Sequence, residues 1–428
     1  MILRYLSITL LFVSIVYGAI YQAPIQATIH TEEMMLKSIY RHSTSSSKRP
    51  GLFQRMDMTT TMSTQSIPFK LKGIQGKTFK LPQGQLDHLL SLRRSGQRLR
   101  SYDHYELQPT DYLVPDVSDH ASVLTLAEMS YNAYTEIGKD GLIWYDLGSE
   151  WQVNSTFGWD RDGIRGHVFG NKDNSLLVIG FKGTTAGLFG GEPTGDKDKL
   201  NDNMLFSCCC GKVNKNWSPV CGCNEGKDQF VCNQKCLDKT LIDSEFYYDY
   251  AMNIFLDVVK QYPEATIWTT GHSLGGAIAT LLGQTFGVPA VSFESPGDRL
   301  ASQRLHLPRA PGAKYMPIWH FGHTADPIFI GVCTGPMSGC YYAGFAMETR
   351  CHTGKSCVWD TVKDNGWRVN IAHHRIGTLI EDILKKPNEF PIPSCKIETD
   401  CDDCGLWTFE DERDILPTNS IFKYGNKL

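Results

Sequence analysis

Hydrophobic residues follow two alternating patterns from about residue 119 onward. Apolar positions at helical spacing between 123 and 133 predict a helix. Ile164–Gly170 then has the composition of a strand. Leu176–Phe181 is continuously apolar, which is typical of a strand buried on both faces of a sheet. We therefore expect a helix followed by two strands.

The same alternation continues through the second half of the chain. An apolar stripe along 243–262 predicts a helix that ends before Pro263. The further expected elements are strands over 265–270, 288–293 and 315–321 and helices over 275–286 and 376–384. Because strands alternate with helices, the pattern predicts an α/β fold with a mostly parallel sheet.

The N-terminal part of the chain has a different pattern. Arg4 precedes an apolar run within residues 1–22, which predicts a signal anchor or a cleaved signal peptide and places the rest of the chain in a lumen. Residues 23–115 are partly of low complexity, and we expect a solvated, partly disordered lumenal region with a few strands. The other predicted divisions are a catalytic domain over 116–386, which contains a cysteine-rich insertion over 207–237, and a cysteine-containing tail over 387–428.

Composition agrees with a globular protein in an oxidising compartment. The formal net charge of the 428 residues is −4, which argues against nucleic acid as the main partner. All 14 cysteines lie beyond residue 207, and seven of them lie between Cys208 and Cys236. Such clustering predicts disulfides. Because seven is odd, at least one of these cysteines must be free or must pair outside the cluster.

Two other features bear on the compartment. Sequons at Asn154 and Asn216 predict glycosylation in a lumen. The spacings Cys221-x-Cys223 and Cys401-x-x-Cys404 resemble those of zinc ligands. We favour disulfides over a metal site because the predicted lumen is oxidising.

The strongest chemical signal is Gly-His-Ser-Leu-Gly at 271–275, which has the pattern Gly-x-Ser-x-Gly. It follows a predicted strand and begins a predicted helix, the context of a sharp turn that exposes a nucleophilic serine. We expect Ser273 to be the nucleophile and His272 to point away into the fold. The alternative is a glycine-rich turn whose serine only caps the helix.

A serine nucleophile needs a base and an acid that orients the base. The downstream carboxylates are Glu294, Asp298 and Asp326, and we favour Asp326 because it follows a predicted strand and precedes a proline. Asp298 is the second choice. The candidate bases are His320, His323, His352, His373 and His374. Those before the acid are expected to be structural, and the adjacent pair at 373 and 374 leaves the choice of base open.

The oxyanion of a tetrahedral intermediate needs two N–H donors. The backbone of Leu274, directly after the nucleophile, supplies one. Thr184 is expected to supply the other, because it follows the end of the buried strand Leu176–Phe181. The alternative at Thr184 is a simple turn.

These motifs resemble those of the class 3 lipases, and more closely those of the fungal autophagy-related vacuolar lipases. The resemblance covers about residues 116–386. It is carried by Leu-Asn-Asp-Asn at 200–203, the elbow at 271–275, His-Thr-Ala-Asp-Pro at 323–327 and His-Arg-Ile at 374–376. It implies an α/β-hydrolase fold and the triad Ser273, Asp326 and His374. Lys182 stands where the class 3 pattern has arginine.

The resemblance also implies a function. Members of that family hydrolyse phospholipids and acylglycerols of autophagic and other vesicles in the vacuole lumen, and they are held by a single signal anchor that reaches the vacuole through the endoplasmic reticulum, Golgi and multivesicular-body membranes. No cofactor or metal is implied. We expect Leu188, Phe189, Leu205 and Phe206 to cover the site or meet the bilayer, or else only to pack against the disulfides.

Three other functions fit parts of the sequence. A secreted esterase that acts on soluble or cell-wall esters, or a serine peptidase, would use the same elbow. A non-catalytic binding protein on a hydrolase scaffold would keep the cysteines but would not need the serine, acid and histidine in this order. Assays on a panel of substrates distinguish the first two functions from a lipase.

Overall fold

The computed structural model describes residues 30–43, 51–57, 69–95, 107–134, 163–183, 196–212, 219–224, 230–335 and 337–410. Outside these ranges lie the predicted anchor over 1–22, the sequons at Asn154 and Asn216, Thr184, and Leu188 with Phe189. None of the helices within the described ranges combines the length and apolar composition that crossing a bilayer requires.

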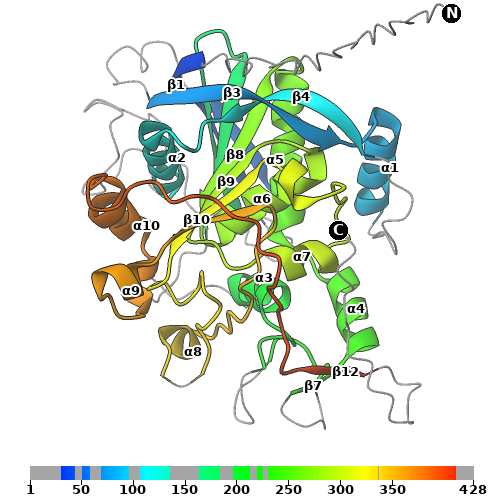
Figure 1. Cartoon of the computed structure of the whole chain (residues 1–428). Coiled ribbons are helices and arrows are strands. Elements are labelled where there is room, and N and C mark those ends of the chain that lie inside the picture. The colour runs from blue at the N-terminus through cyan, green and yellow to red at the C-terminus, as the bar shows by residue number, and fades with distance from the viewer. Residues whose placement is uncertain are drawn as a thin grey trace, which may run out of the picture.

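The chain forms strands and helices in an alternating order (Figure 1). The strands are β1 His30–His42, β2 Phe53–Asp57, β3 Phe69–Lys80, β4 Gln108–Pro115, β5 Ile164–Gly170, β6 Leu176–Phe181, β7 Val231–Asn233, β8 Thr266–His272, β9 Ala290–Phe293, β10 Ile318–His323, β11 Lys355–Trp359 and β12 Thr408–Glu410. The α-helices are α1 Gln83–Arg94, α2 His120–Asn132, α3 Asp196–Phe206, α4 Gln234–Asp243, α5 Tyr247–Gln261, α6 Leu274–Phe286, α7 Arg299–Arg304, α8 Gly339–Ala343, α9 Thr361–Asn365 and α10 Ile376–Thr378. Short 3₁₀ turns are η3 Ala313–Tyr315 and η4 Ile371–His374, and the π-helical turn η5 Leu379–Leu384 continues α10.

One large mixed sheet organises the molecule. Its strand order is β11-β10-β9-β8-β6-β5-β1-β3-β4, and β2 pairs with β1. Strands β6, β8, β9, β10 and β11 run parallel to one another, whereas every pairing among β6, β5, β1, β3, β4 and β2 is antiparallel. The prediction of a mostly parallel sheet was therefore wrong for one half of it. Helices α6 and α7 follow β8 and β9 as crossovers between parallel strands, whereas β5 and β6 are antiparallel and are joined directly by residues 171–175.

The N-terminal region belongs to this sheet. Strand β1 lies between β5 and β3, and the register pairs Tyr40 with Gly166. Tyr40 is fully buried, and its hydroxyl donates a 2.7 Å hydrogen bond to Asp257 on α5. Residues 30–42 and 69–80 are thus not a solvated spacer. The expected boundary at residue 115 coincides with the end of β4 but does not separate two sheets.

Helices cover both faces of the sheet. Within β6, Leu177, Ile179 and Phe181 pack on the face covered by α5 and α6. Leu176 and Val178 pack on the opposite face, against α2 and η5. This alternation explains the continuous apolar run, because both faces of a central strand are buried. Figure 1 shows α2 and α10 on one side of the strands and α6 on the other.

The elements beside the elbow agree best with the sequence. The bounds of β5 and β6 are as expected, and α6 begins one residue earlier, at Leu274. The helix expected over 243–262 is α5, which begins four residues later, at Tyr247, because the separate helix α4 ends at Asp243. The Asp249 carboxylate accepts a 3.3 Å hydrogen bond from the backbone N–H of Phe246, which fixes the start of α5.

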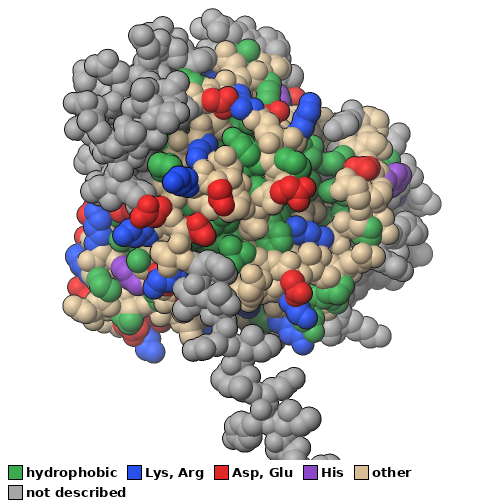
Figure 2. All heavy atoms as spheres, turned by 90° about the horizontal axis from the view of Figure 1, so that it is seen from above, with side chains coloured by type: hydrophobic (Ala, Val, Ile, Leu, Met, Phe, Trp, Pro, Cys, Tyr) green, Lys and Arg blue, Asp and Glu red, His purple; other side chains and the backbone are tan. Residues whose placement is uncertain are grey.

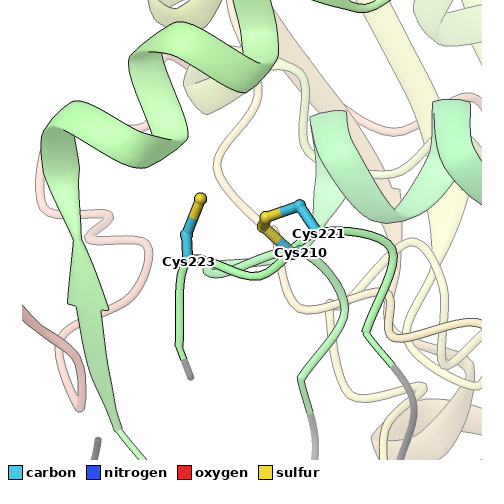
Figure 3. Close-up of side chains that lie close together, drawn as sticks. All are labelled: Cys210, Cys221 and Cys223. Atoms are coloured by element: carbon cyan, nitrogen blue, oxygen red, sulfur yellow. A yellow bond between two sulfur atoms is a disulfide. The ribbon is translucent and has the colours of Figure 1, made fainter. Parts of the chain in front are cut away.

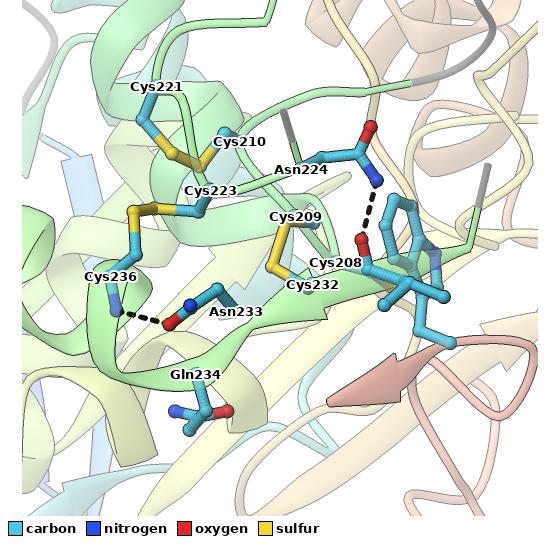
Figure 4. The surroundings of a disulfide bond; sticks show 12 residues. Cys208, Cys209, Cys210, Cys221, Cys223, Asn224, Cys232, Asn233, Gln234 and Cys236 are labelled. Carbon is cyan, nitrogen blue, oxygen red and sulfur yellow. Dashed lines mark hydrogen bonds between the residues drawn. A yellow bond between two sulfur atoms is a disulfide. The ribbon is translucent and has the colours of Figure 1, made fainter. Parts of the chain in front are cut away.

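The cysteine-rich insertion is stapled by disulfides (Figure 4). All 14 cysteines form seven bridges, and Cys208 pairs outside its cluster with Cys404, 196 residues away. The odd count of seven had required a free cysteine or an outside partner, and the structure provides the outside partner. The bridges join Cys208–Cys404, Cys209–Cys232, Cys210–Cys221, Cys223–Cys236, Cys333–Cys340, Cys351–Cys401 and Cys357–Cys395.

The alternative of a zinc site conflicts with this pairing. The sulfur atoms of Cys210, Cys221 and Cys223 lie within 4.8 Å of one another (Figure 3). Cys210 and Cys221 are bonded to each other, and Cys223 is bonded to Cys236. A sulfur in a disulfide has no thiolate to offer to zinc. The short spacing at 221–223 is therefore explained by two neighbouring bridges.

Leu205 and Phe206 were predicted to cover the site or meet a bilayer. Both are buried, at 1% and 0% exposure, and they pack with Cys208 and Cys209 in the core. Their burial agrees with the alternative of packing in the disulfide-containing core, and neither side chain is exposed to a bilayer.

Replacing both Cys208 and Cys404 with serine is expected to lower the free energy of unfolding by about 4 kcal/mol, because this bridge closes a very long loop. The control pair is Cys333 with Cys340, whose separation is only 7 residues and whose removal should cost about 2 kcal/mol. Denaturant titration of both double variants measures the difference. Equal costs would contradict the loop-closure explanation.

Candidate active site

Ser273 stands at a strained turn between β8 and α6. Its φ of 57° and ψ of −131° are unusual for a residue with a side chain, and its N–H donates a 3.0 Å hydrogen bond to the Phe293 carbonyl. A Cβ on Gly271 would collide with the backbone of Gly275, and a Cβ on Gly275 would collide with the Phe181 carbonyl. The two glycines therefore allow the turn that the sequence pattern predicts.

The structure brings the three favoured residues into one chain of hydrogen bonds. His374 Nε2 lies 2.8 Å from Ser273 Oγ, and His374 Nδ1 lies 2.8 Å from Asp326 Oδ2. Ser273, Asp326 and His374 are 8%, 0% and 2% exposed. Asp326 is fixed in turn by the N–H of Ile328, which donates to Oδ1 at 2.9 Å. Residues far apart in sequence thus form the serine–histidine–acid arrangement of an acyl-transfer site.

The three residues come from the ends of adjacent elements. Ser273 follows β8, Asp326 follows β10, and His374 ends η4. Strands β8 and β10 are parallel to β9, so their carboxyl ends meet at the same edge of the sheet. That edge is where open α/β sheets place ligands.

Asp326 stays ionised although it is fully buried. Burial alone would raise the pKa of its carboxyl. The charge of the His374 imidazole, together with its hydrogen bond, outweighs burial and holds that pKa below its usual range. An ionised acid beside Nδ1 keeps the proton on that nitrogen, so Nε2 can accept the proton of Ser273.

Glu294 is the most unusual neighbour of Asp326. It follows β9 with a φ of 49° and is fully buried. Burial and then the charge of Asp326 raise the pKa of Glu294 well above its usual range, and carboxyl oxygens of the two residues lie within 4.8 Å of each other. Because the pKa of Glu294 is raised and that of Asp326 is lowered, Glu294 is the neutral carboxyl of this pair and Asp326 the ionised one.

The other candidate residues have structural partners. Asp298 accepts hydrogen bonds from Thr280 Oγ1 at 2.7 Å and from Thr353 N at 2.7 Å. His373 stacks on Trp367 with ring centroids 4.8 Å apart. Of the adjacent histidines, His374 is therefore the one that contacts Ser273.

The remaining histidines that were weighed as bases are held in buried contacts. Burial lowers the pKa of both His320 and His323 to about 4, which keeps them neutral. His320 Nδ1 lies 2.8 Å from Ser292 Oγ. His352 pairs with Glu398 at 3.2 Å and thereby helps hold the C-terminal tail. The expectation that the histidines before Asp326 are structural agrees with these contacts.

His272 supports the site from behind. Burial lowers its pKa to about 3, so it is neutral. Its Nε2 donates to the His374 carbonyl at 2.7 Å, and its Nδ1 accepts from the Tyr134 hydroxyl at 2.8 Å. It therefore fixes the backbone that carries the base. Neither Tyr134 nor this role of His272 was predicted, because no local pattern links Tyr134 to the elbow.

The second oxyanion donor was expected just after β6, and the structure describes this segment as far as Gly183. A Cβ on Gly183 would lie 3.2 Å from Ser273 Cβ and would collide with the Tyr134 hydroxyl, so the end of β6 passes directly beside the nucleophile. Leu274 begins α6, whose N-terminus faces the same place. Thr184 is the next residue and lies outside the described ranges.

Glu294→Gln is expected to raise the free energy of unfolding at pH 7 by about 1 kcal/mol or more. A carboxyl whose pKa is raised on folding stabilises the fold below its ordinary pKa of 4.5, and this stabilisation is lost as the pH rises. The gain should therefore shrink at pH 4. Ester hydrolysis should persist, because the amide is neutral, like the protonated carboxyl it replaces, and adds no charge beside Asp326.

The control for this prediction is Glu381→Gln. Glu381 is 50% exposed and pairs with Lys385 on the surface, so its loss should change stability by less than about 0.5 kcal/mol. Chemical denaturation at both pH values measures each variant. A Glu294→Gln protein that is less stable than wild type at pH 7 would show that Glu294 is ionised in the fold.

Comparison with known proteins places these features in context. The family model "Lipase (class 3)" matches residues 227–288, which include β8, the elbow and α6. Curated proteins named "Putative lipase ATG15" match much more of the chain. The protein of Saccharomyces cerevisiae S288c is 41% identical over 422 residues, which cover 89% of this chain and 80% of that protein.

Two other relatives with that name are longer than the matched part. The Meyerozyma guilliermondii protein is 46% identical over 77% of this chain and 61% of its own length. The Candida albicans protein is 51% identical over 69% of this chain and 52% of its own length. The match thus spans only about half to three fifths of these relatives.

Solved lipase structures match less closely. The triacylglycerol lipase of Penicillium expansum has a TM-score of 0.28 and 14% identity, over 57% of this chain and 80% of that chain. The Lip2 lipase of Yarrowia lipolytica has a TM-score of 0.25 and 17% identity, over 46% and 61%. These scores are too low to support conclusions about the site.

Proposed function

This chain belongs to the family of the ATG15 lipases, and from that premise we propose that it is a serine lipase that hydrolyses acyl esters of membrane phospholipids and acylglycerols. The observation that carries the proposal is the hydrogen-bonded chain Ser273–His374–Asp326 at a strained turn. The oxyanion donors are Leu274 and Thr184. No metal or organic cofactor takes part.

The reaction follows from these positions. Ser273 Oγ attacks the ester carbonyl while its proton moves to His374 Nε2, and Asp326 stabilises the resulting imidazolium. The oxyanion accepts hydrogen bonds from the two backbone donors, each commonly worth about 3 kcal/mol. The C–O bond then breaks, and His374 gives its proton to the departing alcohol. Water next attacks the acyl-enzyme with His374 as base, which releases the fatty acid and restores Ser273.

The biological setting proposed is the vacuole lumen, where the enzyme would disintegrate autophagic bodies and intravacuolar vesicles. The family name, the disulfides and the sequons at Asn154 and Asn216 support a lumenal protein. The N-terminal segment would act as a signal anchor of a type II membrane protein. Mass spectrometry of the N-terminal peptide from the protein in cells tests this, because a cleaved leader would contradict retention.

Fatty-acid release from phospholipid liposomes and emulsified triacylglycerol, with soluble esters and peptides in parallel, tests the activity. We expect wild-type protein to release fatty acid from lipid and the Ser273→Ala variant to release none above background. Activity confined to soluble esters would favour a secreted esterase, and cleavage of peptides alone would favour a peptidase.

A further inference from the structure

The segment that follows Asp326 carries a cluster of exposed apolar side chains. Residues 327–347, here called the apolar loop, contain no charged side chain and no histidine, although charged residues make up 21% of the chain. Within it Met337 is 97% exposed, Tyr342 79% and Val332 50%. Exposed apolar clusters on soluble proteins commonly mark an interaction surface.

The apolar loop is held rigidly in this exposed form. The Cys333–Cys340 disulfide closes it, and Ser338 Oγ accepts a 3.4 Å hydrogen bond from Tyr341 N at the start of α8. Asn203 on α3 donates to the Gly344 carbonyl at 2.8 Å and accepts from Ala346 N at 2.8 Å. A disulfide and three hydrogen bonds thus fix a segment in which Val332, Met337 and Tyr342 are exposed.

The apolar loop lies beside the triad. It begins directly after Asp326, and Val332 N donates to the Pro327 carbonyl at 2.8 Å. On α8, Gly339 packs so closely against Ile371 that a Cβ would lie 2.9 Å from that side chain. Ile371 begins η4, the turn that ends at His374. The acid and the base are therefore each joined to this surface by only a few residues.

The apolar loop differs in charge from the face seen in Figure 2. The face seen in Figure 2 mixes Lys, Arg, Asp and Glu side chains among apolar ones, as expected of a solvated surface. In Figure 1, α8 stands out in the lower part of the molecule, and Asn203 on α3 is hydrogen-bonded to the residues that follow α8. The Lys199 side chain lies against Gly344, the residue that caps the end of α8. An uncharged tip with a basic residue at its base complements an anionic lipid surface.

We propose that the apolar loop inserts Met337 and Tyr342 into the surface of a phospholipid bilayer and so delivers the lipid ester to Ser273. The occupant is a bilayer because the loop has no charge to desolvate and presents tyrosine, which favours the membrane interface. The assignment rests on the proposed function for its purpose, since the substrate esters lie at that interface. Leu205 and Phe206 are buried and present no such surface.

The test measures binding without hydrolysis. Purified Ser273→Ala protein is sedimented with phosphatidylcholine vesicles, with and without phosphatidylserine. Adding Met337→Ser and Tyr342→Ser should weaken vesicle partition by roughly tenfold to a hundredfold, because two apolar contacts are lost. Met337→Leu with Tyr342→Phe should restore most of it.

A matched control is Ile242→Ser on α4, which removes a 44% exposed apolar side chain from another surface and should leave partition unchanged. In the active protein, Met337→Ser with Tyr342→Ser should leave hydrolysis of a soluble short-chain ester unchanged and reduce release from liposomes at least about tenfold.

The outcomes separate this proposal from the proposed function. Unchanged vesicle partition, or no partition by the Ser273→Ala parent, would overturn the docking surface even if the enzyme hydrolyses lipid. Equal losses on soluble ester and liposomes would also overturn it, because they indicate a structural role. If no ester is hydrolysed, the proposed activity fails, and sedimentation of the Ser273→Ala series still decides the docking surface.

Discussion

Asp326→Asn is expected to lower kcat for ester hydrolysis by about 10⁴-fold with little change in KM. The asparagine amide can donate to His374 Nδ1, and the imidazole would then carry its proton on Nε2, where it faces Ser273. In that tautomer His374 cannot accept the proton of the serine. Steady-state kinetics on a soluble ester, with circular dichroism to confirm folding, measures the loss.

The control is Asp382→Asn, which removes a 52% exposed carboxylate paired with Lys386 and should leave kcat within about twofold. A loss of less than about tenfold in Asp326→Asn would mean that another carboxyl orients the base. Asp298 is not expected to substitute, because its oxygens are occupied by Thr280 and Thr353.

Gly275→Ala is expected to reduce kcat by about 10²-fold or more and to lower the free energy of unfolding by about 3 kcal/mol. Its Cβ would collide with the Phe181 carbonyl and lie 2.6 Å from the Lys182 carbonyl carbon. These are backbone atoms, so relief requires β6 to move away from α6. That movement would separate Gly183 from Ser273 and misalign the expected oxyanion donor that follows β6.

The matched control for this substitution is Gly84→Ala on α1, where a Cβ has open space and alanine favours the helix. It should be neutral or slightly stabilising. Thermal unfolding and kinetics of both variants test the contrast. Wild-type activity in Gly275→Ala would show that the turn can relax without disturbing the site.

Local patterns explain why the central part of the fold could be predicted. Leu176–Phe181 is apolar on both faces because α6 and α2 cover it, and the elbow glycines are required by contacts within the turn itself. The antiparallel half could not be predicted. The position of β1 between β5 and β3 depends on pairing partners such as Tyr40 with Gly166, which lie far apart in sequence.

In the site, too, local features could be predicted from the sequence and contacts between distant elements could not. Ser273 was predictable because its whole strand-turn-helix context is local. Glu294 was seen only as one of several carboxylates, since nothing near it in sequence indicates that β9 and β10 place it beside Asp326. The burial of Phe206 was also hidden, because its apolar character fits a lid as well as a disulfide core. Contacts between elements far apart in sequence determine both the position of Glu294 beside Asp326 and the burial of Phe206.

Covalent labelling with a fluorophosphonate ester tests the central claim most directly, because such reagents phosphonylate only an activated serine. Mass spectrometry of the digested protein should find one phosphonyl group per chain, on Ser273, with activity lost in proportion to labelling. Asp326→Asn should label far more slowly. A label on another residue, or undiminished ester hydrolysis by Ser273→Ala, would contradict the assignment of Ser273 as nucleophile.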